Sequence, residues 1–113
     1  MNQQHWVDEL AAAITVCDED GFILAMNDKS ALTFQQDGGK ALIGRSLYDC
    51  HPEPARTKLV ELMASERANC YTIEKNGVHK MIYQAPWYED GKHRGLVEIS
   101  FEIPSPLPHF VRD

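Results

Sequence analysis

The neighbouring residues Cys50 and His51 are the pair in this chain whose types come closest to covalent catalysis. A cysteine nucleophile needs a base within hydrogen-bond reach and a third group that orients the base. Adjacent residues in a helix or a turn point about 100° apart, so these two side chains do not face each other as a dyad requires. The sequence also contains no G-x-S-x-G, P-loop or H-E-x-x-H pattern. We therefore expect Cys50 to have a structural role and the chain not to be an enzyme.

The three cysteines, Cys17, Cys50 and Cys70, lie far apart in the sequence, and no C-x-x-C pair occurs. This spacing supports neither a structural zinc site nor a disulfide framework. We expect no metal site, and we expect the cysteines to act as small buried hydrophobic residues in a reducing compartment.

A second candidate site consists of aromatic, aliphatic and sulfur-containing side chains. Met81, Tyr83 and Trp87 alternate along one predicted strand, so they share a face that is suited to form the floor of a cavity beneath a long helix. Methionine adapts to irregular shapes, and a tyrosine O–H can orient a ligand. The candidate ligand-binding residues on this reasoning are Met26, Phe34, Tyr48, Leu59, Met63, Met81, Tyr83 and Trp87. The alternative is that the same side chains fill the core.

Composition narrows the class of partner. The 113 residues suit one globular domain, and 11 basic against 17 acidic residues give a net charge of −6. An acidic chain with scattered Lys and Arg repels phosphate backbones, which argues against nucleic acid as a partner. No apolar run approaches the roughly 20 residues of a membrane helix. No basic residue precedes an apolar stretch at the N-terminus, so we expect a cytoplasmic protein without a membrane partner.

The elements that must position these residues are predicted from periodicity and turn signals. Residues 4–13 have the apolar spacing of a short amphipathic helix, with Trp6, Val7 and Leu10 on one stripe. That stripe either covers the chain's own sheet or packs across a homodimer interface. The remaining predicted elements are strands at 13–18 and 22–27, a brief helix ending near 34, a helical turn at 45–52, a long helix at 53–67, and strands at 69–75, 78–88 and 96–103.

Turn signals separate these strands into hairpins. Asp20-Gly21 and Asn76-Gly77 each suit a tight turn between strands, whereas residues 89–95 predict a longer one. Alternation in residues 96–103 predicts one buried and one comparatively wet face. The apolar residues Val97, Ile99, Phe101 and Ile103 share the first, and Glu98, Ser100 and Glu102 share the second. The order of elements therefore predicts an α+β fold with an antiparallel sheet. We divide the chain into an N-terminal helix at 1–12, a domain at 13–103 and a proline-rich tail at 104–113.

This layout resembles the PAS domain over almost the whole chain, from about Trp6 to Ile103. The D-x-D-G-x-I-x-x-x-N run ending at Asn27 is similar to a common PAS opening, and the L-I-G-R-S-L-Y-D-C-H-P run from Leu42 to Pro52 matches the segment before the long helix. Residues 91–100 are similar to the last PAS hairpin. The resemblance implies a five-stranded antiparallel sheet of order 2-1-5-4-3 with helices packed on one face.

The same resemblance implies a sensory or signalling module. Family members hold haem, flavin or a small metabolite between sheet and helices, or hold nothing and dimerise through an N-terminal helix and the outer sheet face. His51 precedes the long helix, where haem-binding members carry an axial histidine, so it is a candidate haem ligand, a candidate contact to another ligand, or a structural residue. A flavin photoadduct is rejected, because no N-C-R-F-L-Q run occurs. No effector follows the predicted domain, so we expect output through a homodimer or a separate signalling protein.

Overall fold

The structure is a computed structural model that describes residues 5–113. Five antiparallel strands form one sheet of order β2-β1-β5-β4-β3, as predicted. The strands are β1 (Ala13–Asp18), β2 (Ile23–Met26), β3 (Asn69–Lys75), β4 (Val78–Glu89) and β5 (Lys92–Ile103). The helices are α1 (His5–Asp8), α2 (Asp28–Thr33), α3 (Leu47–Cys50) and α4 (Ala55–Ser65), with short 3-10 helices η1 (Gln35–Asp37) and η2 (Gly39–Leu42).

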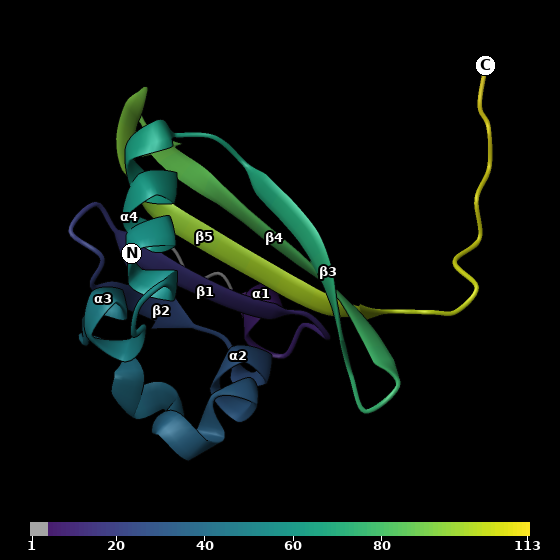
Figure 1. Ribbon diagram of the computed structural model, residues 1–113, viewed down its shortest axis with the longest axis horizontal. Helices are drawn as coiled ribbons and strands as arrows, with labels where there is room; N and C mark the ends of the chain where they lie inside the picture. The colour runs from purple at the N-terminus through teal and green to yellow at the C-terminus, as the bar shows by residue number, and fades with distance from the viewer. Residues whose placement is uncertain (1–4) are drawn as a thin grey trace.

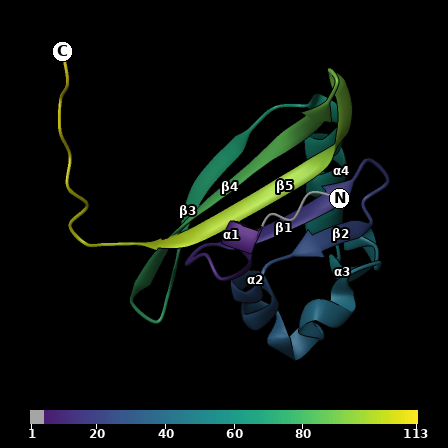
Figure 2. The ribbon, with the colours of Figure 1, turned by 180° about the vertical axis from the view of Figure 1, so that it is seen from behind.

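The helices lie on both sides of this sheet, but unequally. Helices α2, α3 and α4 lie on one side, and α4 crosses the strands near one end of the sheet (Figure 1). Seen from behind, α1 lies on the opposite side, over β1 and β5, and the C-terminal tail runs away from the sheet (Figure 2). We call the side that carries α4 the inner face and the other side the outer face.

The first hairpin shows how local residues set the fold. One carboxylate oxygen of Asp18 accepts the backbone N–H groups of Asp20 and Phe22, each at 2.9 Å, so the carboxylate holds the turn. Gly21 adopts a φ of +86°, and a Cβ there would lie 2.5 Å from the Tyr48 ring. A glycine is therefore required both by the backbone conformation and by the approach of α3.

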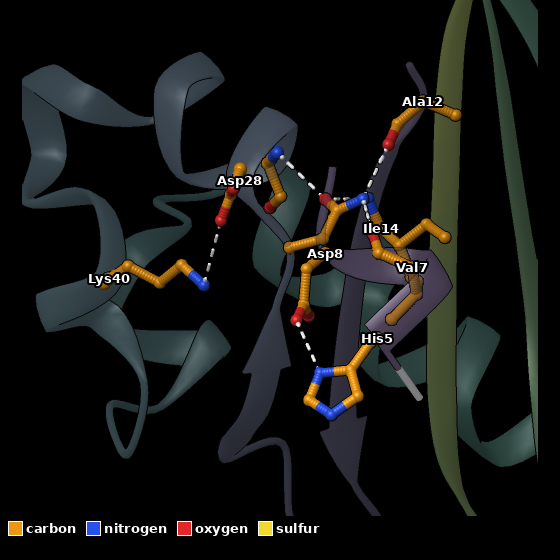
Figure 3. Close-up of polar contacts among 9 residues, drawn as sticks. His5, Val7, Asp8, Ala12, Ile14, Asp28 and Lys40 are labelled. Carbon is orange, nitrogen blue, oxygen red and sulfur yellow. Dashed lines mark hydrogen bonds and ion pairs between the residues drawn. The ribbon is translucent and has the colours of Figure 1, made fainter. Parts of the chain in front are cut away.

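Asn27 joins three elements beneath the sheet. Its side-chain oxygen accepts the N–H of Ile14 at 2.9 Å and that of Ser30 at 3.1 Å, which caps α2. Its amide nitrogen donates to the carbonyls of Val7 and Ala12 (Figure 3). The buried amide thus fixes the chain before β1, the start of β1 and the start of α2 relative to one another.

Two small clusters form the core on the inner face. Cys17 and Leu96 of the sheet pack against Leu59 and Met63 of α4. Ile23, Met26 and Leu42 form the second cluster, and half-buried Phe34 and Leu47 pack against it. Burying a side chain of this size contributes about 1.5–3 kcal/mol, so α4 is held to the sheet mainly by its two buried residues, Leu59 and Met63.

Several predicted boundaries are wrong. The N-terminal helix predicted at 4–13 is only α1, because the chain leaves the helix after Asp8 and bends at Ala11 and Ala12 before it enters β1; residue 4 lies outside the described residues. The long turn predicted at 89–95 is a two-residue turn at Asp90-Gly91, and β5 already begins at Lys92. The long helix is also shorter at both ends than predicted. Within residues 5–113 no helix is long and apolar enough to span a membrane.

The predicted sidedness of β5 is also wrong. Glu98 and Ser100 lie on the inner face with Thr15 and Ala13, their register partners on β1. Val97, Ile99, Phe101 and Ile103, the set predicted to be buried, therefore lie on the outer face. Alternation separates the two faces of a strand, but the pattern alone does not show which of them the helices cover.

Candidate binding cavity

A cavity of about 370 Å³ lies between the sheet and the helices of the inner face. Most of its wall is apolar, and the polar groups gather on the central strands and at the rim. The lining residues are Thr15, Cys17, Ile23, Met26, Phe34, Asp37, Leu42, Arg45, Leu47, Cys50, His51, Leu59, Gln84, Leu96 and Glu98. Its volume falls in the range of small-molecule sites, which combine an apolar wall with a few convergent polar groups.

A second cavity of about 590 Å³ adjoins the first beneath the N-terminal half of α4. The two cavities share four lining residues, His51, Leu59, Gln84 and Glu98. Ala55, Lys58 and Leu62 of α4 form its other wall, and Asn69 and Tyr71 of β3 form its floor. The space under α4 is therefore a continuous trough that runs from the first core cluster towards β3.

The floor of this trough carries a directed chain of side-chain hydrogen bonds. Asn69 Nδ2 donates to Gln84 Oε1 at 3.0 Å, and Gln84 Nε2 donates to Glu98 Oε1 at 2.8 Å. The register places these three residues side by side on β3, β4 and β5. Every donor in the chain points towards β5, so the chain ends on the carboxylate of Glu98.

His51 is held at the junction of the two cavities. Its Nδ1 lies 2.7 Å from the carbonyl of Leu47, which accepts only from a protonated Nδ1. The neutral ring then has Nε2 as its acceptor. Arg56 of α4 donates to the carbonyls of Tyr48 and His51, so α3 and the start of α4 are tied together around this ring.

Burial perturbs several titratable groups around the trough. Burial raises the pKa of the Cys17 thiol above its ordinary value, so this side chain stays a neutral thiol. The pKa of the Tyr71 phenol is raised, first by burial and then by the negative charge of Glu98. Burial likewise raises the pKa of Tyr48. These groups are therefore neutral at physiological pH, and none is poised as a nucleophile.

The structure brings only part of the predicted ligand set together. Met26, Phe34, His51 and Leu59 line the first cavity. Tyr48 and Met63 instead pack in the core cluster around Cys17.

Met81, Tyr83 and Trp87 do not floor the cavity, and that prediction is wrong. They alternate with Gln84, which does line it, so they lie on the outer face. Trp87 there donates its ring N–H to the carbonyl of Cys17 at 2.9 Å. Because the outer positions of β4 are more hydrophobic than its inner positions, hydrophobicity favoured the wrong face.

Among the lining residues that sequence reasoning missed are three polar residues of the sheet, Thr15, Gln84 and Glu98. Glu98 and its neighbours were assigned to a solvated face, since a charged residue in an alternating strand is usually exposed. Their register could have identified them. Once the strands are paired in the order 2-1-5-4-3, these three polar residues lie in one row across the sheet.

The outer face carries the predicted dimer residues. Trp6 is 68% exposed and Leu10 is 39% exposed, whereas Val7 is half-buried and accepts a hydrogen bond from Asn27. Tyr83 and Phe101 add large side chains that are 40% and 39% exposed. An apolar face that remains this open is typical of an interaction surface.

Several solved structures are similar to this fold. A domain from Streptococcus mutans has a similar structure, with a TM-score of 0.71, 19% identity, and coverage of 88% of this chain and 81% of that chain. The PAS domain of BvgS from Bordetella pertussis is similar at a TM-score of 0.65 and 19% identity, covering 88% of this chain and 82% of the other. No curated protein matches the sequence.

A third similar structure is the Aer2 receptor from Vibrio cholerae, described as a dual PAS-haem oxygen sensor. Its TM-score is 0.59 at 13% identity, and the match covers 82% of this chain and 95% of that chain. Likenesses at these identities show the fold alone. The family model of the PAS fold matches residues 7–104 of this sequence, which agrees with the extent of the predicted resemblance. This chain therefore belongs to the PAS family, whose fold is typical of sensory modules in signalling proteins.

Proposed function

We propose that this chain is a non-enzymatic sensory module that binds a small molecule in the trough under α4 and relays occupancy through a homodimer. The observation that carries the proposal is the cavity of about 370 Å³ on the inner face. Its apolar wall can bury the body of a ligand, while Glu98, Gln84 and His51 offer polar contacts that fix its orientation. In this proposal residues 13–103 form the sensing unit, and residues 1–12 belong to the dimer contact.

The same proposal gives α4 the role of the moving element. Its buried contacts with the sheet are made by Leu59 and Met63, and its N-terminal half borders the trough. At the C-terminal end of α4, the hydroxyl of Tyr88 from β4 donates to the Oε1 atom of Glu66 at 3.1 Å. A ligand under the N-terminal half would therefore fill space that no side chain fills and would add contacts between that half of the helix and the sheet.

The outer face is proposed as the contact between two copies. A two-fold interface needs a surface that complements itself, and an apolar sheet face meets that need against an identical face. Ile14, Tyr83 and Ile99 form one row across this face by the strand register. A signal then passes through one layer of sheet, since Glu98 and Ile99 are neighbours on β5 that point to opposite faces.

A haem sensor with His51 as axial ligand is not the function that this cavity favours. The orientation of His51 does suit a ligand, because Nδ1 is engaged and Nε2 is the acceptor. However, Glu98 and Gln84 line the same cavity, and a porphyrin ring would separate these polar groups from water. Such burial costs several kcal/mol, so the donor set as a whole fits a haem poorly.

Native mass spectrometry of the protein as expressed tests the proposal. We expect a bound small molecule and a dimeric mass in the wild type. Leu59→Phe adds apolar volume where the two cavities meet, so we expect this variant to lose the small molecule while it stays folded. Val60→Phe is the matched control, because Val60 is 48% exposed on the same helix. A wild type without a bound molecule, whose melting temperature no small metabolite raises, would leave only a ligand-free interaction domain.

A further inference from the structure

The carboxylate of Glu98 is a polar group in the wall of the trough whose hydrogen-bonding capacity the described chain does not fill. An ionised carboxylate accepts up to about four hydrogen bonds. Glu98 is half-buried, and the one side-chain donor to it among residues 5–113 is Gln84 Nε2, at 2.8 Å on Oε1. Its second oxygen, Oε2, is left for a donor that this part of the chain does not provide.

No cation of the described chain neutralises Glu98. The ion pairs within residues 5–113 are His5–Asp8, Lys40–Asp28, His79–Glu74 and Arg94–Glu89. Arg45 lines the first cavity and Lys58 lines the second, but neither forms an ion pair with Glu98. A positive group placed beside this carboxylate would gain a charge-assisted hydrogen bond.

We propose that the ligand is a small organic cation, a protonated primary amine on an apolar chain or ring, whose ammonium group binds Glu98. This inference rests on the proposed function and names the chemistry of the ligand. The ammonium donates to the free oxygen of Glu98. The apolar body lies against Ile23, Leu42, Leu59 and Leu96, which line the same cavity.

The direction of the hydrogen-bond chain supports a cation rather than an anion. Asn69 donates to Gln84, and Gln84 donates to Glu98, so both amides stabilise the negative charge at the end of the chain. An anionic ligand at this position would meet like charge. The net charge of −6 adds a long-range field that attracts cations to the protein.

Three probes of similar size separate the possible ligand classes: phenethylamine, phenethyl alcohol and hydrocinnamate, which are a cation, a neutral molecule and an anion. Binding to the wild type is measured by calorimetry and by shifts of backbone amide resonances. We expect the amine to bind at least about tenfold more tightly than the alcohol, which is the usual worth of a charge-assisted hydrogen bond. We expect hydrocinnamate to bind more weakly than the alcohol. This series needs no variant, so it stands even if a substitution disturbs folding.

A matched pair of variants assigns the effect to one carboxylate. Glu98→Gln keeps an oxygen that can accept from Gln84 but removes the charge, so we expect about a tenfold loss of amine affinity and little change for the alcohol. Glu102→Gln removes the same charge from the same face of β5 outside both cavities, and we expect amine affinity to stay unchanged.

The outcomes distinguish this inference from the proposed function. If the alcohol or hydrocinnamate binds as tightly as the amine, or if Glu98→Gln leaves amine affinity unchanged, the cation assignment is overturned and the ligand site stands. If none of the three probes binds the wild type at millimolar concentration, the cation assignment is also overturned. In that case a bound molecule in the native mass spectrum decides whether the proposed function survives.

Discussion

At the scale of residues, two polar side chains on the inner side of the sheet differ in how much of their hydrogen-bonding capacity is used. Asn27 is 4% exposed and uses its whole hydrogen-bonding capacity, with two bonds accepted and two donated. Glu98 has one side-chain donor within the described residues. A fully satisfied buried amide specifies the fold, whereas a partly satisfied carboxylate in a cavity wall is suited to a ligand.

We predict that Asn27→Ala lowers the free energy of unfolding by about 3 kcal/mol, because it removes a helix cap and leaves backbone groups of Ile14, Val7 and Ala12 without their partner. Urea denaturation measures the loss. Asn69→Ala is the control, since Asn69 is exposed on β3, and we expect a change within about 0.5 kcal/mol. Equal losses in the two variants would contradict the role assigned to Asn27.

We predict that the three cysteines differ sharply in reactivity. Cys50 and Cys70 are exposed, so the prediction that the cysteines are buried is wrong for these two, and both should react rapidly with a thiol reagent. Cys17 is 1% exposed, and burial raises the pKa of its thiol, so it should react only after unfolding. Labelling followed by mass spectrometry counts the fast and slow sites. Rapid modification of Cys17 in the folded protein would contradict the packing beneath α4.

At the scale of elements, the hairpins were predictable because their turns carry local signals. Asn76 and Gly77 both adopt positive φ between β3 and β4, the conformation that an Asn-Gly pair favours. Asp18 and Gly21 likewise specify the first turn from within four residues of sequence. The strand order and the covered face are not local properties, since they depend on which strands pair across long loops.

The cavity floor shows why the site was harder to predict than the fold. Met81 and Tyr83 belong to the more hydrophobic face of β4, so burial against α4 was expected for them. The structure places them on the outer face, and polar Gln84 lies beneath the helix. A hydrophobic strand face indicates burial either in the chain's own core or against a partner, and the sequence of one chain does not distinguish the two.

We predict that Met63→Ala destabilises the protein by about 2–3 kcal/mol, because Met63 is 7% exposed and holds α4 against Cys17 and Leu96. Val60→Ala is the control on the same helix, with an expected change within about 0.5 kcal/mol because Val60 is 48% exposed. Thermal unfolding measures both. A larger loss for Val60→Ala would show that α4 presents another face to the sheet.

At the scale of the whole molecule, the two faces of the sheet differ in the side chains that they present. The inner face holds the trough and its polar row, and the outer face presents aliphatic and aromatic side chains around α1. Asn27 links α1 to the inner face, because its amide nitrogen donates to the carbonyl of Val7 in α1 and its amide oxygen caps α2. A change beneath the sheet can therefore reach the proposed interface through few contacts.

We predict that the protein is a dimer that Phe101→Glu dissociates, because a charge on the outer face would be buried against a second copy. Trp6→Ala should weaken the dimer, since Trp6 is 68% exposed on α1. Phe110→Glu is the control, because Phe110 is a 71% exposed residue of the tail. Sedimentation velocity measures the mass. A monomer at high concentration, or a dimer that survives Phe101→Glu, would contradict the proposed interface.

The position of a bound ligand is the most direct test of a binding site beneath α4. Nuclear Overhauser effects between phenethylamine and assigned methyl groups report which side chains lie within a few ångströms of the probe. We predict contacts with the methyl groups of Leu59 and Leu96, which line the trough, and none with Val97 or Ile99 on the outer face. Contacts with Val97 and Ile99 in place of Leu59 and Leu96 would contradict a ligand site beneath α4.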